Sequence, residues 1–405
     1  MTKNPIIAGL DIGSYATKIL IAKKRPDGRG FEVLGRSITL SEGVRKGVIK
    51  DKKKVRRGIE EALRQAEQEA GREVDGVFVN VNGSHIFSIS SEGLVSVSRA
   101  DQKISDQDLK RVIDAAKTFS TPSNKEIIEV IPQEYVVDDQ GGIKDPLGLT
   151  GIRLEAKILA VGGFTPYMEK TSETVLESGL AVNDIILGPI AGSEAVLDDQ
   201  EKELGVAVVD LGSETTSLTV YEDGEVIHTS VLPMGVANVR NDIAIGLKIS
   251  ISAADKILEE MGHFILGEVS GRRKVVNLPD GDEISFREKD LKRIARARVE
   301  EIFDLINEEL EEIERAGLLP AGIVITGGGA KLDNLIEFVK DKTGLPVRIG
   351  APDDFYPSQK DPSLSTVCGL VEIGIMMEEG SGSFDFVFDR NLGKKIKKIL
   401  RIFMP

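Results

Sequence analysis

Two segments of the sequence join a carboxylate, a glycine and a hydroxyl in the order Asp-x-Gly-Ser. One runs from Asp11 to Ser14, and the other, in the second half of the chain, runs from Asp210 to Ser213. In such a turn, glycine lets backbone N–H groups approach a phosphate, the hydroxyl adds a donor, and the carboxylate can hold a hydrated divalent cation. Two such turns, a domain apart, predict a nucleotide bound between two related halves of the molecule.

A third segment has three consecutive glycines, Gly327, Gly328 and Gly329, between a predicted strand at 322–325 and a predicted helix at 332–342. Glycines place no side chain between the backbone and a ligand, which suits contact with a nucleobase or sugar, while a helix N-terminus favours phosphates. A plain strand-to-helix turn rarely needs three glycines. We therefore interpret this segment as a further nucleotide contact.

The elements that must position these turns are predicted from apolar and β-branched runs. The clearest is a helix at residues 52–70, begun by Asp51 and ended by Gly71. Between residues 84 and 161 the pattern changes to short strands around one helix, which predicts a small inserted α+β unit. The predicted strands of the first half lie at residues 6–10, 18–22, 77–81, 86–89, 94–98, 126–137, 155–161 and 185–187, and its other helices at 106–119 and 167–178.

The second half of the sequence predicts two helices within residues 237–262, a polar hairpin at 272–286 and a long helix at 289–316. This long helix has cations in its first half, including Lys292, Arg293 and Arg296, and acids in its second half. The helix macrodipole favours the reverse order by roughly 0.3–1 kcal/mol per terminal charge. A solvated helix face is the commoner explanation, and docking of an acidic peptide on the basic half is the alternative.

The end of the chain differs from everything before it. Residues 379–383 have the Gly and Ser composition of a flexible linker. The segment 392–403 then has apolar residues at helical spacing, five cations and no acid. A helix of about 18 Å is too short for a bilayer of about 30 Å but suits its surface. The residues expected at the membrane are Leu392, Lys394, Lys395, Ile396, Lys397, Lys398, Ile399, Leu400, Arg401 and Phe403. A helix folded back on an acidic lobe and a calmodulin-type target peptide are the alternatives.

Composition limits the class of protein. The chain has 405 residues, of which 41% are hydrophobic and 29% charged, as in soluble globular proteins with two or more lobes. The net charge of −14 argues against a nucleic-acid partner. Cys368 is the only cysteine, so an intrachain disulfide is impossible, and its apolar neighbours predict a buried position. Without a basic-then-apolar export signal or a membrane-spanning run, we expect a cytosolic protein.

The three loops, in this order, resemble those of the actin, sugar-kinase and heat-shock ATPase superfamily. Residues 43–51, 66–71 and 82–86 further resemble the bacterial cell-division family FtsA, as do 104–113 and 202–206, so the likeness covers nearly the whole chain. It implies an α/β, actin-like ATPase fold of two related lobes, with an inserted α+β subdomain in the first lobe and a C-terminal amphipathic helix. The implied domains are a first-lobe core at 1–83 and 162–199, the inserted FtsA-type subdomain at 84–161, a second-lobe core at 200–243 and 318–379, its outer subdomain at 244–317, a linker at 380–391 and a membrane-targeting helix at 392–405.

The resemblance also implies ATP and Mg²⁺ as ligands. The metal would be held by Asp11 and Asp210, and the adenine would meet Lys256 and Glu259, unless these two form an exposed ion pair. No catalytic residue is implied. The nucleotide would be bound by Asp11, Gly13, Ser14, Tyr15, Thr17, Lys18, Asp210, Gly212, Ser213, Thr215, Lys256, Glu259, Gly327, Gly328, Gly329 and Lys331.

A member of this family is expected to be a peripheral protein on the cytoplasmic face of the inner cell membrane at the division site. There it would polymerise into short actin-like filaments, bound to the anionic membrane surface. Its long helix, through Lys292, Arg293 and Arg296, would bind the C-terminal peptide of the division tubulin FtsZ. Residues 84–161 would bind other division proteins.

Two departures from the family pattern affect the expected chemistry. Ser213 and Glu214 replace a glycine-rich run, which places a carboxylate near the expected phosphates and weakens the expected hold on a γ-phosphate. Relatives that hydrolyse ATP have an acid or amide before the proline that follows the first lobe, whereas Leu187 and Gly188 precede Pro189 here. Glu194 is interpreted as a helix-surface residue. We therefore expect at most a weak ATPase, in which the nucleotide is a structural ligand.

Two rival functions share this fold. A PilM-like cytosolic adaptor of type IV pilus assembly would also have the inserted subdomain, but it should lack the basic amphipathic tail. A small-molecule kinase would need a general base at a substrate cleft. The three histidines, His85, His228 and His263, do not lie beside any of the loops. The tail and the histidines therefore favour the division protein.

Overall fold

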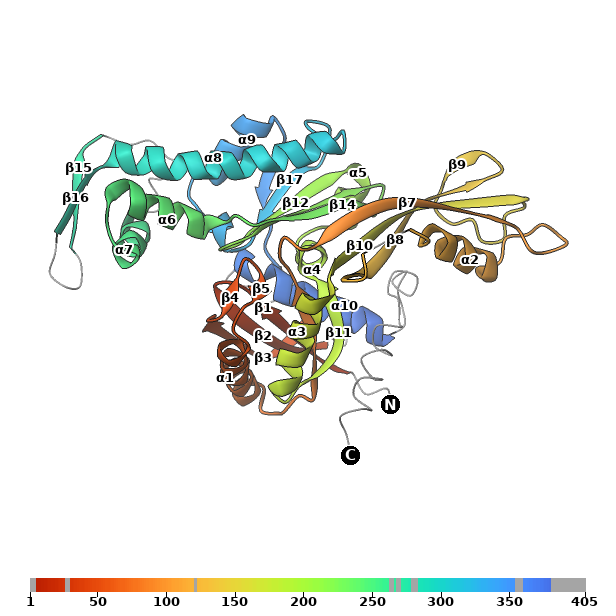
Figure 1. Cartoon of the computed structure of the whole chain (residues 1–405), viewed down its shortest axis with the longest axis horizontal. Helices are drawn as coiled ribbons and strands as arrows, with labels where there is room; N and C mark the ends of the chain where they lie inside the picture. Colours follow the sequence, from red (N-terminus) through yellow and green to blue (C-terminus); the bar gives the residue numbers. More distant parts are fainter. Residues whose placement is uncertain are drawn as a thin grey trace.

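The structure, a computed structural model, describes residues 5–25, 30–119, 122–261, 266, 271–277, 283–353 and 360–379. Figure 1 shows two lobes, each built on its own β-sheet, and an inserted subdomain that projects to one side. The predicted linker and tail, and the turn of the polar hairpin, lie outside the described residues. Within those residues, every helix is too short or too polar to cross a membrane.

The two lobes repeat one sheet topology. In each, an antiparallel three-stranded meander is followed by two strands parallel to its first strand. The first sheet has the spatial order β11 (Ala181–Leu187), β6 (Gly76–Val81), β1 (Ile6–Ile12), β2 (Ala16–Lys24), β3 (Phe31–Leu40). The second has the order β14 (Glu225–Leu232), β13 (Thr216–Glu222), β12 (Val206–Leu211), β17 (Gly322–Thr326), β18 (Val347–Ile349). The structure thus confirms the two related halves inferred from the turns.

Helices cover both faces of the first sheet. On one face lies α1 (Lys52–Ala70), whose buried stripe includes Val55, Ile59 and Ala62, with α3 (Thr165–Glu177) beside it. The other face packs on α10 (Ser365–Glu379), which contains the buried Cys368, and α10 in turn contacts α4 (Gly188–Glu194). The chain therefore returns to the first lobe after the second sheet is complete, which ties the two lobes together. The expected second-lobe core at 318–379 is thus too long at its end, because α10 packs on the first sheet.

The inserted subdomain has a four-stranded antiparallel sheet with one helix on it. The sheet order is β7 (Phe87–Ser96), β10 (Arg153–Phe164), β8 (Lys125–Val137), β9 (Gln140–Ile143). The helix α2 (Asp106–Ala116) begins at a capping box formed by Ser105 and Asp108 and packs on β7 and β10. This unit has a small core of its own, which includes Leu109, Val112 and Leu154.

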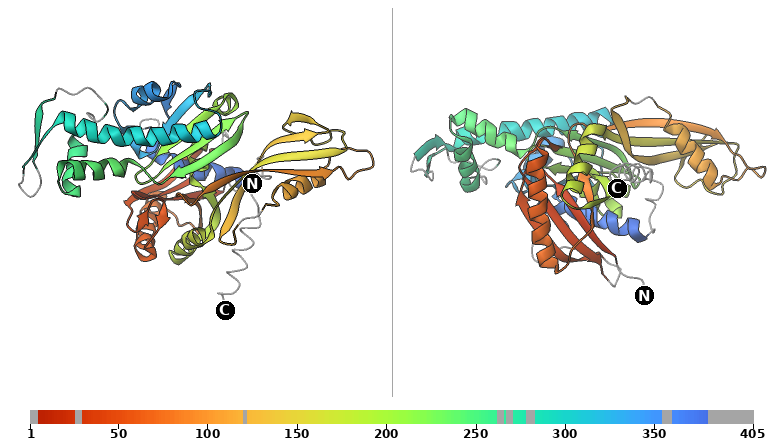
Figure 2. Two further views of the ribbon diagram at one scale, coloured as in Figure 1. Left: turned by 45° about the horizontal axis from the view of Figure 1, so that its top comes forward. Right: turned by 60° about the horizontal axis from the view of Figure 1, so that its bottom comes forward.

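The outer part of the second lobe lies at the end of the molecule opposite the inserted subdomain (Figure 2). It contains α6 (Val236–Leu247), α7 (Ile251–Met261), the hairpin β15 (Arg273–Asn277) and β16 (Glu283–Arg287), and the long helix α8 (Glu288–Glu312). The side of α8 that carries Leu291, Val299 and Phe303 is buried, as its sequence pattern predicts. The charged residues of α8 therefore lie mainly on its other faces.

Several predicted elements need correction. The strands expected at 86–89 and 94–98 are one continuous strand, β7, because both segments pair with β10 along its length. The helix predicted at 332–342 begins later than expected: a 3₁₀ turn covers Gly328–Lys331, and α9 (Leu335–Thr343) begins only after Asn334, which has a left-handed φ of 60°. The α9 N-terminus therefore does not directly follow the glycines.

Candidate nucleotide-binding site

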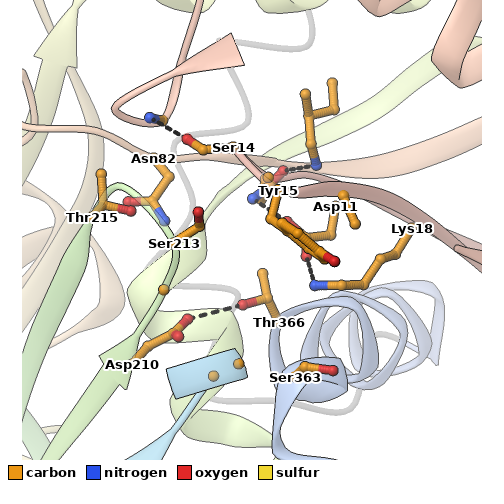
Figure 3. A pocket seen from close by; sticks show the side chains of 18 of the residues that line it. Asp11, Ser14, Tyr15, Lys18, Asn82, Asp210, Ser213, Thr215, Ser363 and Thr366 are labelled. Carbon is orange, nitrogen blue, oxygen red and sulfur yellow. Dashed lines mark hydrogen bonds and ion pairs between the residues drawn. The ribbon is translucent and has the colours of Figure 1, made fainter. Parts of the chain in front are cut away.

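A cavity of about 400 Å³ lies between the two lobes and is lined by both Asp-x-Gly-Ser turns. In Figure 3 Asp11 and Ser14 of the first turn and Asp210 and Ser213 of the second line one cavity, with Ser363 and Thr366 beside them. The two turns have the same backbone geometry: the N–H of Gly13 donates to the carbonyl of Ala16 at 3.1 Å, and that of Gly212 to the carbonyl of Thr215 at 3.0 Å. Sequence similarity between the turns therefore corresponds to structural equivalence across the cleft.

The carboxylate of Asp11 is held in place by two side chains. It accepts from Lys18 Nζ and from Asn80 Nδ2, both at 2.8 Å, and Asn80 Oδ1 accepts from the N–H of Ile12 at 2.8 Å. Asn80 comes from β6, the strand next to β1. The sequence prediction missed Asn80 because no spacing pattern links it to the turn it supports.

The second carboxylate, Asp210, has a different environment. Its Oδ2 accepts a long hydrogen bond, 3.4 Å, from Oγ1 of Thr366 on α10. Burial raises the pKa of Asp210 to about 6, partly offset by the opposite charge of Lys18 and reinforced by Asp11. Burial alone would lower the pKa of Lys18, but Asp11 and Asp210 together raise it. Two facing acids thus share one lysine, which leaves an excess of negative charge suited to a bound cation.

Oxygen ligands with room for water are what Mg²⁺ prefers. Asp11 and Asp210 could supply such oxygens from opposite sides of the cleft. Among the residues that the structure describes, no group of three or more acidic, histidine or cysteine side chains could hold a metal without further ligands. An ion here would therefore share waters and the phosphates of a nucleotide, as Mg²⁺ commonly does.

The three consecutive glycines have three different roles. Gly327 has a φ of 81°, and a Cβ atom there would lie 2.1 Å from Asp210 Oδ1. A Cβ on Gly328 would meet nothing within 4 Å, and this residue lines the cavity. Gly329 instead packs against Leu211 and Val236, and a side chain at this position would collide with both. The prediction of three ligand-facing glycines was therefore too simple.

The structure brings most of the predicted residues to one cavity. Those that line it are Asp11, Gly13, Ser14, Tyr15, Lys18, Asp210, Gly212, Ser213, Thr215, Gly327, Gly328 and Lys331. Thr17 does not line it, because its side chain is buried and its Oγ1 lies 3.0 Å from Ser41 Oγ. Lys256 on α7 is also outside the lining and pairs with Glu260 at 3.3 Å. The side chain of Glu259 lies outside the described residues.

Further lining residues come from segments that carry no phosphate-loop pattern. They include Asn80 and Asn82 at the end of β6, and Ser363 and Thr366 at the start of α10. Apart from the family resemblance at 82–86, their signal in the sequence is a pair of amides at the end of a strand and hydroxyls around the start of a helix.

Two glutamates do not have the positions expected for them. Glu194 is only 10% exposed, pairs with Lys202 at 2.8 Å and accepts from the Tyr221 hydroxyl at 3.4 Å, so it is not a helix-surface residue. Glu214 follows the second turn but does not line the cavity. Its carboxylate accepts from Arg45 and from the N–H of Lys46 instead of lying near the expected phosphates.

The predicted basic surface of α8 is partly used within the molecule. The Arg296 side chain pairs with Glu300 at 2.9 Å and stacks over Phe338 at 4.9 Å, while Arg293 is exposed. The nearby Arg298 forms a two-bonded pair with Asp242 of α6. Of the three predicted cations, Arg293 is thus the exposed one, whereas Lys292 and Arg296 are partly buried.

Known protein families match both the region of the second lobe and the inserted subdomain. A family model described as Cell division protein FtsA matches residues 207–369, and one described as SHS2 domain inserted in FTSA matches residues 83–161. The FtsA of Pseudomonas aeruginosa is 33% identical over 92% of this chain and 90% of its own length, and that of Bacillus subtilis is 32% identical over 92% and 84%.

Solved structures show the fold. The PilM-PilN type IV pilus biogenesis complex matches with a TM-score of 0.68 at 16% identity, over 92% of this chain and 99% of that one. MreB 5 of Spiroplasma citri bound to AMPPNP matches with a TM-score of 0.53 at 14% identity, over 93% and 98%. At such identities the likeness concerns the actin-like ATPase fold alone. Together with the sequence relatives, it places this chain in the FtsA family of cell division proteins.

Proposed function

We propose that this protein binds ATP with Mg²⁺ between its lobes and acts as an actin-like scaffold that links FtsZ filaments to the cell membrane during septum formation. The observation that supports it most is the single cavity lined by two equivalent Asp-x-Gly-Ser turns and by Gly327 and Gly328. The turns would hold the phosphates through their N–H groups, the hydroxyls of Ser14 and Ser213 and the Lys18 ammonium. Asp11 and Asp210 would hold the metal ion.

The nucleotide is a structural ligand in this proposal, and hydrolysis is slow or negligible. Leu187 and Gly188 precede Pro189, so that segment supplies no carboxylate or amide to orient a water. Glu194, the next acid along the chain, is engaged by Lys202 and Tyr221 and lines a different cavity. Rapid turnover by the purified protein with magnesium would contradict this part of the proposal.

The membrane and partner contacts use three other regions. Residues 392–403 would lie in the anionic surface of the cytoplasmic membrane, and filament formation would multiply this weak contact. The C-terminal peptide of FtsZ would bind the basic half of α8, around Lys292, Arg293 and Arg296. Other division proteins would bind the inserted subdomain at 84–161.

A cavity beside the inserted subdomain supports the last of these contacts. It measures about 610 Å³ and is bordered by α2 and β8 on one side and by the second lobe on the other. Glu129, fully buried on β8, has one carboxyl oxygen without a hydrogen-bond partner, and burial raises its pKa to about 8, with Glu194 adding to the shift.

Vesicle flotation with the full chain and with a chain truncated after Glu379 tests the membrane part. The full chain is expected to float with anionic vesicles, more strongly when ATP promotes assembly, and the truncated chain is expected to stay at the bottom. Neutral vesicles are the control, because they keep the apolar surface but remove the attraction for the five cations. Equal flotation of both chains would contradict a membrane role for the tail.

A further inference from the structure

Glu214 connects the two lobes. Its carboxylate, on the second phosphate turn, accepts from Arg45 Nη1 at 2.6 Å and from the N–H of Lys46 at 2.8 Å. Both Arg45 and Lys46 belong to the first lobe: Arg45 ends β4 (Val44–Arg45), and Lys46 begins the turn to β5 (Val48–Ile49). The Glu214 side chain is only 16% exposed, whereas Arg45 is 70% exposed. The bond to the Lys46 amide is thus the better shielded half of this contact.

The same first-lobe turn also contacts the first phosphate turn. The N–H of Gly47, the residue after Lys46, donates to Ser14 Oγ at 3.0 Å, and Gly47 itself lines the cavity. Successive amides of one short turn therefore bind the two phosphate turns, one from each lobe. A separation of the lobes at this point would stretch or break the bonds to Glu214.

This short turn is firmly fixed to the first lobe. Lys46 and Gly47 both have left-handed φ values, 50° and 74°, and a Cβ on Gly47 would lie 2.8 Å from the backbone nitrogen of Gly83. At its base, the N–H of Lys50 donates to the carbonyl of Gly43 at 2.7 Å. The turn is thus a fixed anchor point, not a loose loop.

On the other side, the loop that carries Glu214 is bonded to the start of α6. The N–H of Val236 donates to the carbonyl of Gly212 at 3.0 Å, and that of Ala237 to the carbonyl of Ser213 at 2.7 Å. α6 in turn packs on α8. The contact at Glu214 therefore joins the first lobe to the part of the second lobe from which the outer subdomain extends.

We propose that Glu214, with Arg45 and the amide of Lys46, forms a clasp that holds the lobes closed around the nucleotide and controls its release. This inference rests on the proposed ATP site. A charged hydrogen bond to a backbone amide, partly shielded from water, is stronger than an exposed surface ion pair. The opposite role, a carboxylate that repels the phosphates, would give effects of the opposite sign.

The first test measures the release rate of a fluorescent ATP analogue, with Mg²⁺, from the full-length protein. Glu214→Ala is expected to speed release about tenfold, which corresponds to about 1.4 kcal/mol. Arg45→Ala, which leaves the amide bond intact, is expected to have a smaller effect in the same direction. Glu61→Ala is the matched control, because Glu61 pairs with Arg64 at the same 2.6 Å but within α1 alone. Unchanged or slower release from Glu214→Ala would overturn the clasp.

The second test needs no nucleotide. Spin labels on Arg57→Cys of α1 and Ile245→Cys of α6 report the separation of the lobes, and both positions are exposed. The native Cys368 is fully buried, so the labels attach at the introduced sites. Glu214→Ala is expected to broaden and lengthen the distance distribution, and an unchanged distribution would overturn the clasp. If the wild-type protein failed to bind ATP, the proposed function would fail while this measurement still tested the clasp.

Discussion

At the scale of single residues, the two aspartates of the cleft have equivalent places and different environments. Asp11 is satisfied by Lys18 and Asn80. Asp210 has only a long bond from Thr366, and its pKa is raised to about 6. The second turn therefore contains a carboxylate that the protein alone leaves poorly compensated. A bound cation would supply the missing charge.

The substitution Asp210→Asn is expected to have opposite effects on stability and on ligand binding. Folding raises the pKa of Asp210 from 3.8 to about 6, so between these values the folded protein holds a proton that the unfolded chain has lost. Ionisation through this range therefore destabilises the nucleotide-free fold as pH rises. At neutral pH we expect Asp210→Asn to increase the free energy of unfolding by about 1–3 kcal/mol, in urea without nucleotide. The gain should disappear below the usual pKa of an aspartate.

The same substitution should weaken Mg²⁺-dependent ATP binding, because an amide cannot replace the charge of the carboxylate. In the wild type, this binding should also weaken as pH falls through about 6, where Asp210 takes up a proton. Calorimetric titrations with and without Mg²⁺ measure both effects. A variant that is less stable than the wild type at neutral pH, with unchanged magnesium dependence, would show that Asp210 is a structural residue.

Gly327 and Gly328 offer a matched pair of substitutions. Gly327→Ala would place a methyl group against Asp210 Oδ1 and force a side chain into a left-handed φ of 81°. We expect it to cost roughly 2 kcal/mol or more of stability. Gly328→Ala has free space around its Cβ, so thermal or urea unfolding should show almost no change. Equal losses for the two variants would contradict the different roles assigned to these glycines.

At the scale of elements, local signals in the sequence predicted some segments well and others poorly. The helix α1 has the expected bounds because Asp51 accepts from the N–H groups of Lys53 and Lys54, and Gly71 has the left-handed φ of a helix end. The helix predicted at 332–342 is present as α9, but it begins at Leu335 because the left-handed Asn334 precedes it, and no pattern in the sequence indicates that start.

The missed parts of the site depend on tertiary contacts. Asn80 and Thr366 reach the two aspartates from segments far away in the sequence, so no local spacing could identify them. The direction of the Glu214 side chain is likewise set by Arg45 and Lys46, which lie in the other lobe. The turns could be recognised because their functional residues are adjacent in the sequence. The residues that orient them lie far away in the sequence, so no local pattern includes them.

The basic half of α8 is the element on which partner binding is tested. Arg293→Glu should weaken binding of the FtsZ C-terminal peptide about tenfold, because it replaces an exposed attractive charge by a repulsive one. Fluorescence anisotropy of the labelled peptide measures the affinity, and added salt should reduce the difference. Glu308→Arg, an exposed change in the acidic half of the same helix, is the control that should not weaken binding. Equal affinity of Arg293→Glu and wild type would remove α8 as the docking site.

Arg296 gives a less direct result than Arg293. Its side chain is paired with Glu300 and stacked on Phe338, so Arg296→Glu also disturbs packing between α8 and α9. A stability measurement must therefore accompany any binding result for this variant.

At the scale of the whole molecule, two equivalent sheets face one cavity, and two of the contacts between the lobes lie beside it. α10 carries Thr366 of the first lobe to Asp210 of the second, and the β4–β5 turn carries the amide of Lys46 to Glu214. The outer subdomain and the inserted subdomain lie at opposite ends of this closed core (Figure 2). A ligand in the cleft would therefore stabilise one orientation of the outer subdomain relative to the inserted subdomain.

A crystal structure of the full chain with ATP and Mg²⁺ would decide whether the cleft is the nucleotide site. We expect the phosphates to lie between the turns at Gly13 and Gly212, the metal ion near Asp11 and Asp210, and the adenosine against Gly328. An empty cleft at saturating ATP, or a nucleotide bound elsewhere with both turns unchanged, would contradict this proposal.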